Sequence, residues 1–148
     1  FGPYQYPEKV IPLFVTNALE DRPLPLYGDG KNVRDWLYVL DNCAAIDLVL
    51  RRGRDGEIYN IGGSTEVENI ALTRRILSLL GRPESLIQPV TDRPGHDLRY
   101  ALDCRKIERE LGWTATESFE SGLAKTVDWF LENEEWWRPL RAKRRSSP

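Results

Sequence analysis

Apolar residues recur every three or four positions along several segments of the chain, which is the spacing of one helix face. The pattern predicts helices over residues 8–21, 41–52, 70–80, 103–112 and 118–137. Four of these segments begin at a residue type that commonly caps a helix, namely Asp41, Asn69, Asp103 and Ser118.

Short runs rich in β-branched and aromatic residues predict strands at residues 24–27, 33–39 and 57–61. Helices and strands alternate along the chain, so the fold class is α/β or α+β. The strands are too few to form a convincing sheet by themselves. Several of them are therefore expected to join a sheet whose other strands lie outside this chain.

The charge is unevenly distributed. The 148 residues include 21 basic and 23 acidic side chains, a formal charge of −2. Residues 138–148 contain five basic side chains and no acidic one, which leaves a net charge of −7 on residues 1–137. This balance argues against a general nucleic-acid binder. It predicts a folded domain over residues 1–137 and a disordered basic tail over residues 138–148.

Cysteine and histidine are scarce. Cys43 and Cys104 stand alone and His96 is the single histidine, so neither a disulfide scaffold nor a Cys- or His-rich metal site is expected. No run approaches the length of a membrane span, and no targeting segment opens the chain. We predict a reduced, cytoplasmic protein. A chain that opens on Phe1 and contains no methionine also resembles the middle of a larger protein.

Two apparent cofactor motifs are incomplete. Gly28 and Gly30 begin a dinucleotide-binding pattern, but the third glycine is replaced by Val33, which starts a strand, so a hairpin turn is expected instead. Tyr27 and Lys31 have the spacing of the acid/base pair of short-chain dehydrogenases. Because the glycines between them do not support a helix, the two side chains are not expected to share a face.

The loop at residues 92–97, followed by Arg99 and Tyr100, gathers guanidinium, imidazole and phenol groups on a backbone that Pro94 and Gly95 constrain. Arginine forms bidentate, charge-assisted bonds, so this group suits a phosphate or diphosphate. The alternative is a polar surface turn whose arginines pair with nearby aspartates. The residues alone leave both interpretations open.

Arg34 lies on the same predicted strand face as Trp36 and Tyr38, a placement suited to an anion beside a planar ring. The alternative is a solvated cation–π pair with Trp36. Asp35 lies on the apolar face, where a carboxylate needs a partner.

Asn69 is first a helix cap and second a ligand-binding residue, whereas Lys9 is ordinarily a solvated charge. The aromatic residues between 129 and 137 are expected to pack in the core, because the glutamates among them would repel a nucleic acid.

Six segments together resemble the C-terminal half of the dTDP-glucose 4,6-dehydratases, which are extended short-chain dehydrogenase/reductases. The resemblance runs from Phe1 to about Trp137. Its segments are FGPYQYPEKVIPLF, LPLYGDGKNVRDWLYV, IYNIGG, DRPGHDLRYALD, KIERELGW and GLAKTVDWFLENEEWW.

The resemblance implies an extended Rossmann-type enzyme that uses NAD to oxidise sugar carbon 4, eliminate water across carbons 5 and 6 and return the hydride to carbon 6. It also implies that the glycine fingerprint and the catalytic residues lie upstream of the segment that begins here. This chain would then carry no catalytic residue and no NAD site, and would be inactive without its N-terminal half. A homodimer is expected for the full-length enzyme.

The resemblance further implies which residues contact the dTDP-sugar. They are Lys9, Val10, Ile11, Pro12, Pro25, Leu26, Tyr27, Arg34, Asn69, Asp92, Arg93, Pro94, Gly95 and His96. The chain departs from the family pattern at Leu40 and Asn42, where the family usually has an acidic residue and a histidine. Two alternatives remain: half of a sugar-nucleotide epimerase or decarboxylase, which the DRPGHD loop disfavours, and a non-catalytic binding or assembly module.

Overall fold

The computed structural model describes the backbone of residues 1–145 and the side chains through Ala142. The described residues form six α-helices, one 3-10 helix and five short strands, which confirms the predicted α/β class. The helices are α1 (Val10–Leu19), α2 (Val39–Arg52), α3 (Asn69–Leu79), α4 (Arg105–Leu111), α5 (Phe119–Glu132) and α6 (Glu134–Arg145). The strands are β1 (Leu24–Tyr27), β2 (Val33–Asp35), β3 (Glu66–Glu68), β4 (Ile87–Val90) and β5 (Arg99–Tyr100), and the 3-10 helix spans Glu84–Leu86.

The strands form two small sheets. In the first, β1 runs parallel to β4, with Tyr27 opposite Val90. In the second, β2 lies between β3, to which it is antiparallel, and β5, to which it is parallel. The glycine turn at residues 28–30 therefore joins strands of two different sheets. The turn was expected, but the hairpin was wrong, because β1 and β2 have different partners.

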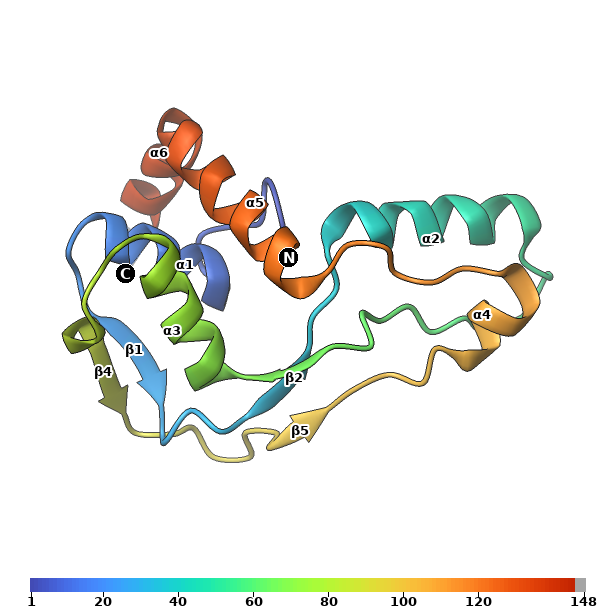
Figure 1. Ribbon diagram of the computed structural model, residues 1–148, viewed down its shortest axis with the longest axis horizontal. Coiled ribbons are helices and arrows are strands. Elements are labelled where there is room, and N and C mark those ends of the chain that lie inside the picture. The colour runs from blue at the N-terminus through green and yellow to red at the C-terminus, as the bar shows by residue number, and fades with distance from the viewer. Residues whose placement is uncertain (146–148) are drawn as a thin grey trace.

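The larger core lies where α1, α3 and α5 pack together against β1, on the left of Figure 1. Its fully buried side chains include Ile11, Leu72, Phe130 and Trp137. The hydroxyl of Thr126 is also buried and donates to the carbonyl of Gly122 one turn earlier, so no polar group is left unpaired by its burial.

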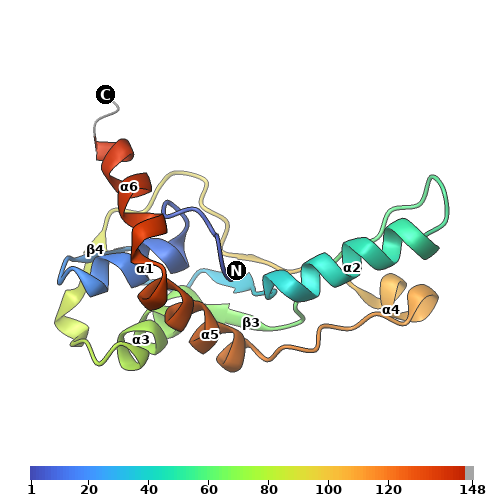
Figure 2. The same ribbon diagram turned by 90° about the horizontal axis from the view of Figure 1, so that it is seen from above.

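A second, smaller core lies between α2 and α4, at the other end of the elongated molecule (Figure 1). It contains Ala45, Ile107, Leu111 and Trp113. Seen from above, α2 and α4 extend away from the helices of the larger core, and α6 also projects from it (Figure 2).

Helix starts agree with the sequence only in part. Ser118 caps α5 as predicted, accepting a hydrogen bond from the backbone N–H of Ser121 at 3.1 Å. Asp41 does not cap α2, because the helix already begins at Val39. Its buried carboxylate instead accepts hydrogen bonds from the hydroxyl of Thr116 and the backbone N–H of Glu117, both at 2.8 Å.

Two of the three predicted strands were partly or wholly wrong. The strand expected at 33–39 ends at Asp35, since α2 begins four residues later. Residues 57–61 form no strand, and β3 forms further along the chain. Side-chain contacts hold the 57–61 segment against α4. One of them is the ion pair between the ammonium of Lys106 and the carboxylate of Glu57 at 2.6 Å.

The basic segment is a helix through Arg145, so the prediction of a disordered tail was wrong for residues 138–145. Residues 146–148 lie outside the described part. Two cations in the described part of this segment have partners: the guanidinium of Arg138 lies 4.9 Å from the buried ring of Trp137 and pairs with Glu134, and that of Arg141 donates to the side chain of Asn17. The boundary expected after Trp137 thus falls inside α6, where Trp137 itself is buried.

Within residues 1–145, no helix is long and apolar enough to cross a lipid bilayer. The same part of the chain holds no group of three or more metal-ligating side chains.

Candidate anion-binding site

The parallel pairing of β1 and β4 brings the loop of residues 92–97 to the end of β1. The backbone N–H of Gly28 donates to the carbonyl of Val90 at 2.9 Å, and the ring of Tyr27 lies 5.7 Å from the ring of His96. Two segments that the sequence separates by some sixty residues are therefore neighbours.

The loop is folded around Asp92. One carboxylate oxygen of Asp92 lies 2.6 Å from Nδ1 of His96 and accepts the backbone N–H of Arg93 at 2.8 Å. The contact with His96, followed by the backbone bond, holds the pKa of Asp92 below its ordinary value. The side chain of His96 is only 8% exposed, and its ring lies between Asp92 of the loop and Tyr27 of β1.

Arg34 reaches the same loop from β2. Its guanidinium donates to the carbonyl of Asp97 at 2.9 Å and lies over the ring of Tyr100 at 4.4 Å. The sequence indicates Trp36 as a possible cation–π partner of Arg34. The partner is instead Tyr100, because the neighbouring ring comes from β5 and not from β2. Both hydrogen-bond acceptors of Arg34 are backbone carbonyls, so no carboxylate of the described residues neutralises its charge.

The other arginines of this region divide into two kinds. Arg99 is neutralised by Glu66 through contacts of 2.5 and 2.6 Å. The side chain of Arg93 has no hydrogen bond or ion pair within the described residues, although its backbone N–H is bonded. The loop is an exposed polar turn, but its own arginines do not form the ion pairs of the alternative interpretation: Asp92 pairs with His96, and Asp103 pairs with Arg105 further along the chain.

Asn69 is the first residue of α3, and its backbone N–H donates to the carbonyl of Asn32 at 3.0 Å. The helix cap is Glu68, which offers no side-chain bond. The capping role predicted for Asn69 was therefore wrong. Its Oδ1 is buried without a hydrogen-bond partner, so an acceptor is available beside β2.

Asn32 joins these segments, a role that no pattern in the sequence indicates. Its side-chain amide donates to the carbonyl of Asp97 at 3.1 Å, the atom that Arg34 also binds, while its own carbonyl holds Asn69. Only 6% of Asn32 is exposed. A lone asparagine after a turn carries no pattern, because its main partner lies 65 residues away.

The segment from Lys9 to Pro12 is connected to the other predicted site residues by packing in the core. Lys9 precedes α1 and its exposed ammonium pairs with Glu8 at 3.0 Å. Ile11 is buried in the larger core together with Leu26 of β1, so packing sets the position of this segment. The remaining predicted positions lie on β1 (Pro25) and in the 92–97 loop (Pro94 and Gly95).

Two further predictions concern neighbouring positions. The partner that Asp35 was expected to need is the backbone: its carboxylate accepts from the N–H groups of Gly63 and Thr65 at 3.1 and 3.0 Å. Leu40 is 64% exposed at the start of α2, whereas Asn42 in the same turn is half-buried, so only the departure at Leu40 lies on an open helix face.

Comparison with known proteins gives a consistent result. The family model described as GDP-mannose 4,6 dehydratase matches residues 1–126. A probable dTDP-glucose 4,6-dehydratase of Sinorhizobium fredii is 53% identical over 150 residues, which cover 97% of this chain and 43% of the relative. The chain thus spans less than half the length of the curated relatives it matches.

Solved structures agree. The dTDP-glucose 4,6-dehydratase of Streptomyces venezuelae, solved with NAD bound, is 58% identical with a TM-score of 0.92, and the match covers 95% of this chain and 44% of that one. An epimerase of Methanothermobacter thermautotrophicus is 33% identical with a TM-score of 0.87, covering 94% and 43%. The fold is thus shared with epimerases, whereas the sequence is closer to the dehydratases.

Proposed function

The chain belongs to the GDP-mannose 4,6 dehydratase family, and from this premise we propose that it forms the substrate-binding part of a dTDP-glucose 4,6-dehydratase. The proposed reaction of the whole enzyme converts dTDP-glucose into its 4-keto-6-deoxy product with loss of water. The part assigned to this chain is to hold the nucleotide diphosphate. The identity of 53% and 58% with two dehydratases supports this choice of substrate.

The observation that carries the proposal is a pair of arginines that form no ion pair. Neither Arg34 nor Arg93 has an ion pair among the described residues, whereas the neighbouring Arg99 pairs with Glu66. After the contact with His96, the charge of Arg93 also lowers the pKa of the adjacent Asp92. Two guanidinium groups around one loop are suited to the two phosphates of a diphosphate, because each forms short charge-assisted bonds. The unpaired Oδ1 of Asn69 is an acceptor, so it suits a hydroxyl or N–H group of a ligand and not a phosphate oxygen.

We assign NAD to the portion of the enzyme that this chain does not represent. The test is the turn at Gly28 and Gly30, which leads into strand β2, whereas a pyrophosphate cradle needs a helix N-terminus there. The residues present therefore do not fit the cofactor. Tight binding of NAD by this chain alone would contradict the assignment.

The remainder of the proposal concerns the assembled enzyme. It includes an NAD-binding half as the partner of this chain, a homodimer of the whole enzyme and a cytoplasmic location. The unpaired state of Cys43 and Cys104 is consistent with a reducing compartment.

The test of the diphosphate site is calorimetry of the 148-residue chain with dTDP. We expect Arg34→Ala and Arg93→Ala each to weaken binding by about 1.5–3 kcal/mol, the value of a hydrogen bond to a charged group. Arg99→Ala is the matched control, because its charge is already neutralised by Glu66, and a smaller loss is expected. Unchanged affinity in both Arg34→Ala and Arg93→Ala would discard the diphosphate site.

The dehydratase and the epimerase assignments differ in product. With the enzyme assembled from this chain and an NAD-binding half of a relative, we expect a 4-keto-6-deoxy sugar nucleotide from dTDP-glucose. A product with all oxygens retained and one inverted centre would instead favour the epimerase, whose fold is similar.

A further inference from the structure

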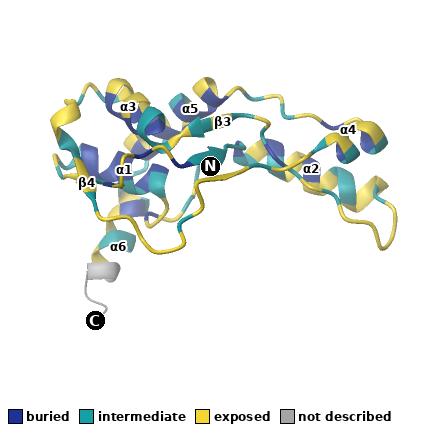
Figure 3. Cartoon of the chain, turned by 90° about the horizontal axis from the view of Figure 1, so that it is seen from below, coloured by how far each residue is buried: buried dark blue, intermediate teal, exposed yellow. Residues whose placement is uncertain are grey.

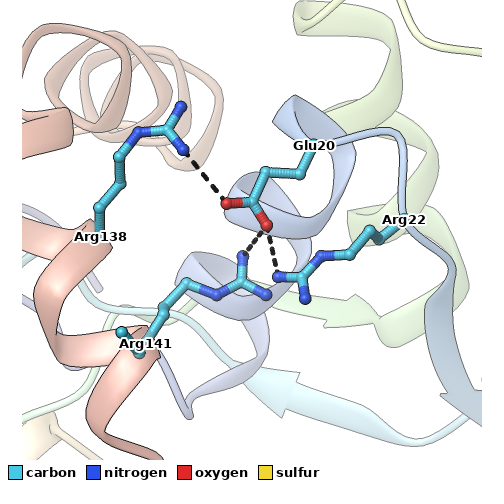
Figure 4. Close-up of a pocket in the computed structure, with 5 residues that line it drawn as sticks. Glu20, Arg22, Arg138 and Arg141 are labelled. Atoms are coloured by element: carbon cyan, nitrogen blue, oxygen red, sulfur yellow. Dashed lines mark hydrogen bonds and ion pairs between the residues drawn. The ribbon is translucent and has the colours of Figure 1, made fainter. Parts of the chain in front are cut away.

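A hollow of about 290 Å³ lies where the end of α1 meets α6, lined by Glu20, Arg22, Arg138, Arg141 and Ala142. Figure 4 shows the guanidinium groups of the three arginines converging on the carboxylate of Glu20. Arg22 lies 2.6 Å from this carboxylate, but Arg138 and Arg141 lie 3.4 and 3.6 Å from it. One carboxylate is thus shared by three cations and bonded closely by only one of them.

Two guanidinium nitrogens of the arginines that line the hollow are buried without a hydrogen-bond partner. They are Nε of Arg22 and Nη1 of Arg141, and the second of these faces the carboxylate of Glu20 at 3.6 Å, beyond hydrogen-bond distance. Buried donors are nearly always paired in folded proteins, so two orphans from two residues in one hollow indicate that an acceptor belongs there. The hollow has room for more than one water molecule or for a small oxyanion, since a water occupies about 30 Å³ in the liquid.

The cations are held in place before any ligand arrives. Arg141 donates to Oδ1 of Asn17 at 2.6 Å, and Asn17 is itself 8% exposed and donates to the carbonyl of Pro23 at 2.7 Å. Arg138 lies over the buried ring of Trp137. Because the guanidiniums are fixed by these contacts, little side-chain entropy remains to be lost on binding.

The local charge also favours an anion. Arg22, Arg138 and Arg141 are opposed by Glu20 and by Glu134, which pairs with Arg138 at 2.6 Å, so one positive charge is left over. We propose that this hollow is a second anion site of the protein, which binds a phosphate group between Arg22 and Arg141.

The second site is separate from the candidate diphosphate site. Glu20 and Arg22 precede β1, whereas Tyr27 ends it, and three residue steps of strand span about 10 Å. The proposal does not depend on the proposed function, since it rests on none of the residues assigned to the dTDP-sugar.

The test is the binding of inorganic phosphate to the 148-residue chain, measured as the rise in melting temperature over chloride of equal ionic strength. We expect a rise in the parent, and a phosphate affinity about tenfold or more weaker in Arg22→Gln and Arg141→Gln, which each remove one charge-assisted bond. Arg52→Gln is the matched control, because it removes the same charge from an exposed position on α2.

Glu20→Gln gives a test in the opposite direction, since it removes the carboxylate that competes for the three arginines. We expect it to strengthen phosphate binding, and this outcome remains measurable if an arginine variant fails to fold. No phosphate-specific rise in the parent, or a rise that survives in both Arg22→Gln and Arg141→Gln, would overturn the proposal.

A second titration, with dTDP, distinguishes a phosphate group of the nucleotide from a free phosphate ion as the ligand of this hollow. If dTDP occupies this hollow, its affinity falls in Arg141→Gln. If the ligand is a free phosphate ion, dTDP binding in Arg141→Gln is unchanged. Loss of the phosphate effect in Arg34→Gln but not in Arg141→Gln would mean that phosphate binds only at the candidate diphosphate site, which would also overturn the proposal.

Discussion

At the scale of single residues, the partner of each arginine separates those that can bind an anion from those that cannot. Arg34 and Arg99 lie on adjacent strands, yet only Arg99 has a carboxylate opposite it. The sequence shows several cations in this region but does not separate the paired from the unpaired ones, because Glu66 lies 33 residues from Arg99 and reaches it only through the sheet.

Asn32 is the residue whose removal tests how the site is held together. Asn32→Ala deletes the bond to the carbonyl of Asp97 but leaves Arg34 bound to the same atom. We expect dTDP binding to weaken by about 1 kcal/mol, the value of one neutral hydrogen bond. We also expect the combined effect of Asn32→Ala and Arg34→Ala to be less than additive, because both act on one loop.

Asn60→Ala is the control for this prediction, since its side chain makes the same kind of bond, to the carbonyl of Asp103 at 3.2 Å, away from the site. Calorimetry of the two single variants and the double variant checks it. Strict additivity of Asn32→Ala with Arg34→Ala would show that Asn32 does not position the loop.

At the scale of elements, helices were predicted better than strands. The helix starting near Ile70 follows from local spacing, and the cap of α5 at Ser118 follows from one residue type. Short strands carry no such local signal, because a strand forms only where another strand offers its backbone. Residues 57–61 have strand-forming side chains but no neighbouring strand, so they stay extended along α4.

Asp41 shows how one carboxylate joins two elements, the first turn of α2 and the segment before α5. Burial raises its pKa, but the hydrogen bonds from Glu117 and Thr116 lower it more, so the net pKa is below the ordinary value. A depressed folded-state pKa adds stability above the unfolded-state pKa, and this contribution is lost as the pH falls through the folded-state value.

We therefore expect the free energy of unfolding to fall as the pH drops below about 4, the ordinary range of an aspartate. Asp41→Asn should lower stability at pH 7 by about 1–2 kcal/mol through one weakened bond, and should show a smaller loss below pH 4. Urea unfolding at several pH values measures both. An equal pH dependence in the variant and the parent would show that protonation of Asp41 does not cause the loss of stability at low pH.

At the scale of the whole molecule, large apolar side chains are exposed to solvent on α2 and beside β5, away from the larger core. On α2, Leu40 is 64%, Ile46 53% and Leu50 82% exposed. Figure 3 shows exposed residues along this helix. Leu98, Tyr100 and Leu102, on and beside the edge strand β5, are each at least half exposed. Exposed apolar patches of this kind mark interfaces, which agrees with the proposed NAD-binding partner.

The prediction at this scale is that the isolated chain self-associates with rising concentration. Replacing Ile46 and Leu50 together by lysine should reduce the association, because charges on α2 make its burial costly. Leu79→Lys is the control, since Leu79 is 48% exposed on α3. Light scattering measures the mass, and a parent that stays monomeric at all concentrations would contradict an open interface on α2.

The sequence by itself determined the family, the α/β class and most of the helices. These follow from local spacing and from motifs that are contiguous in the chain. The tertiary structure decided what depends on distant partners: the strand pairing, the order of the basic segment in α6, the neutralisation of Arg99 and the central place of Asn32. Hydrogen bonds and ion pairs depend on distances of about 3 Å, and only folding brings residues so far apart in sequence within that range.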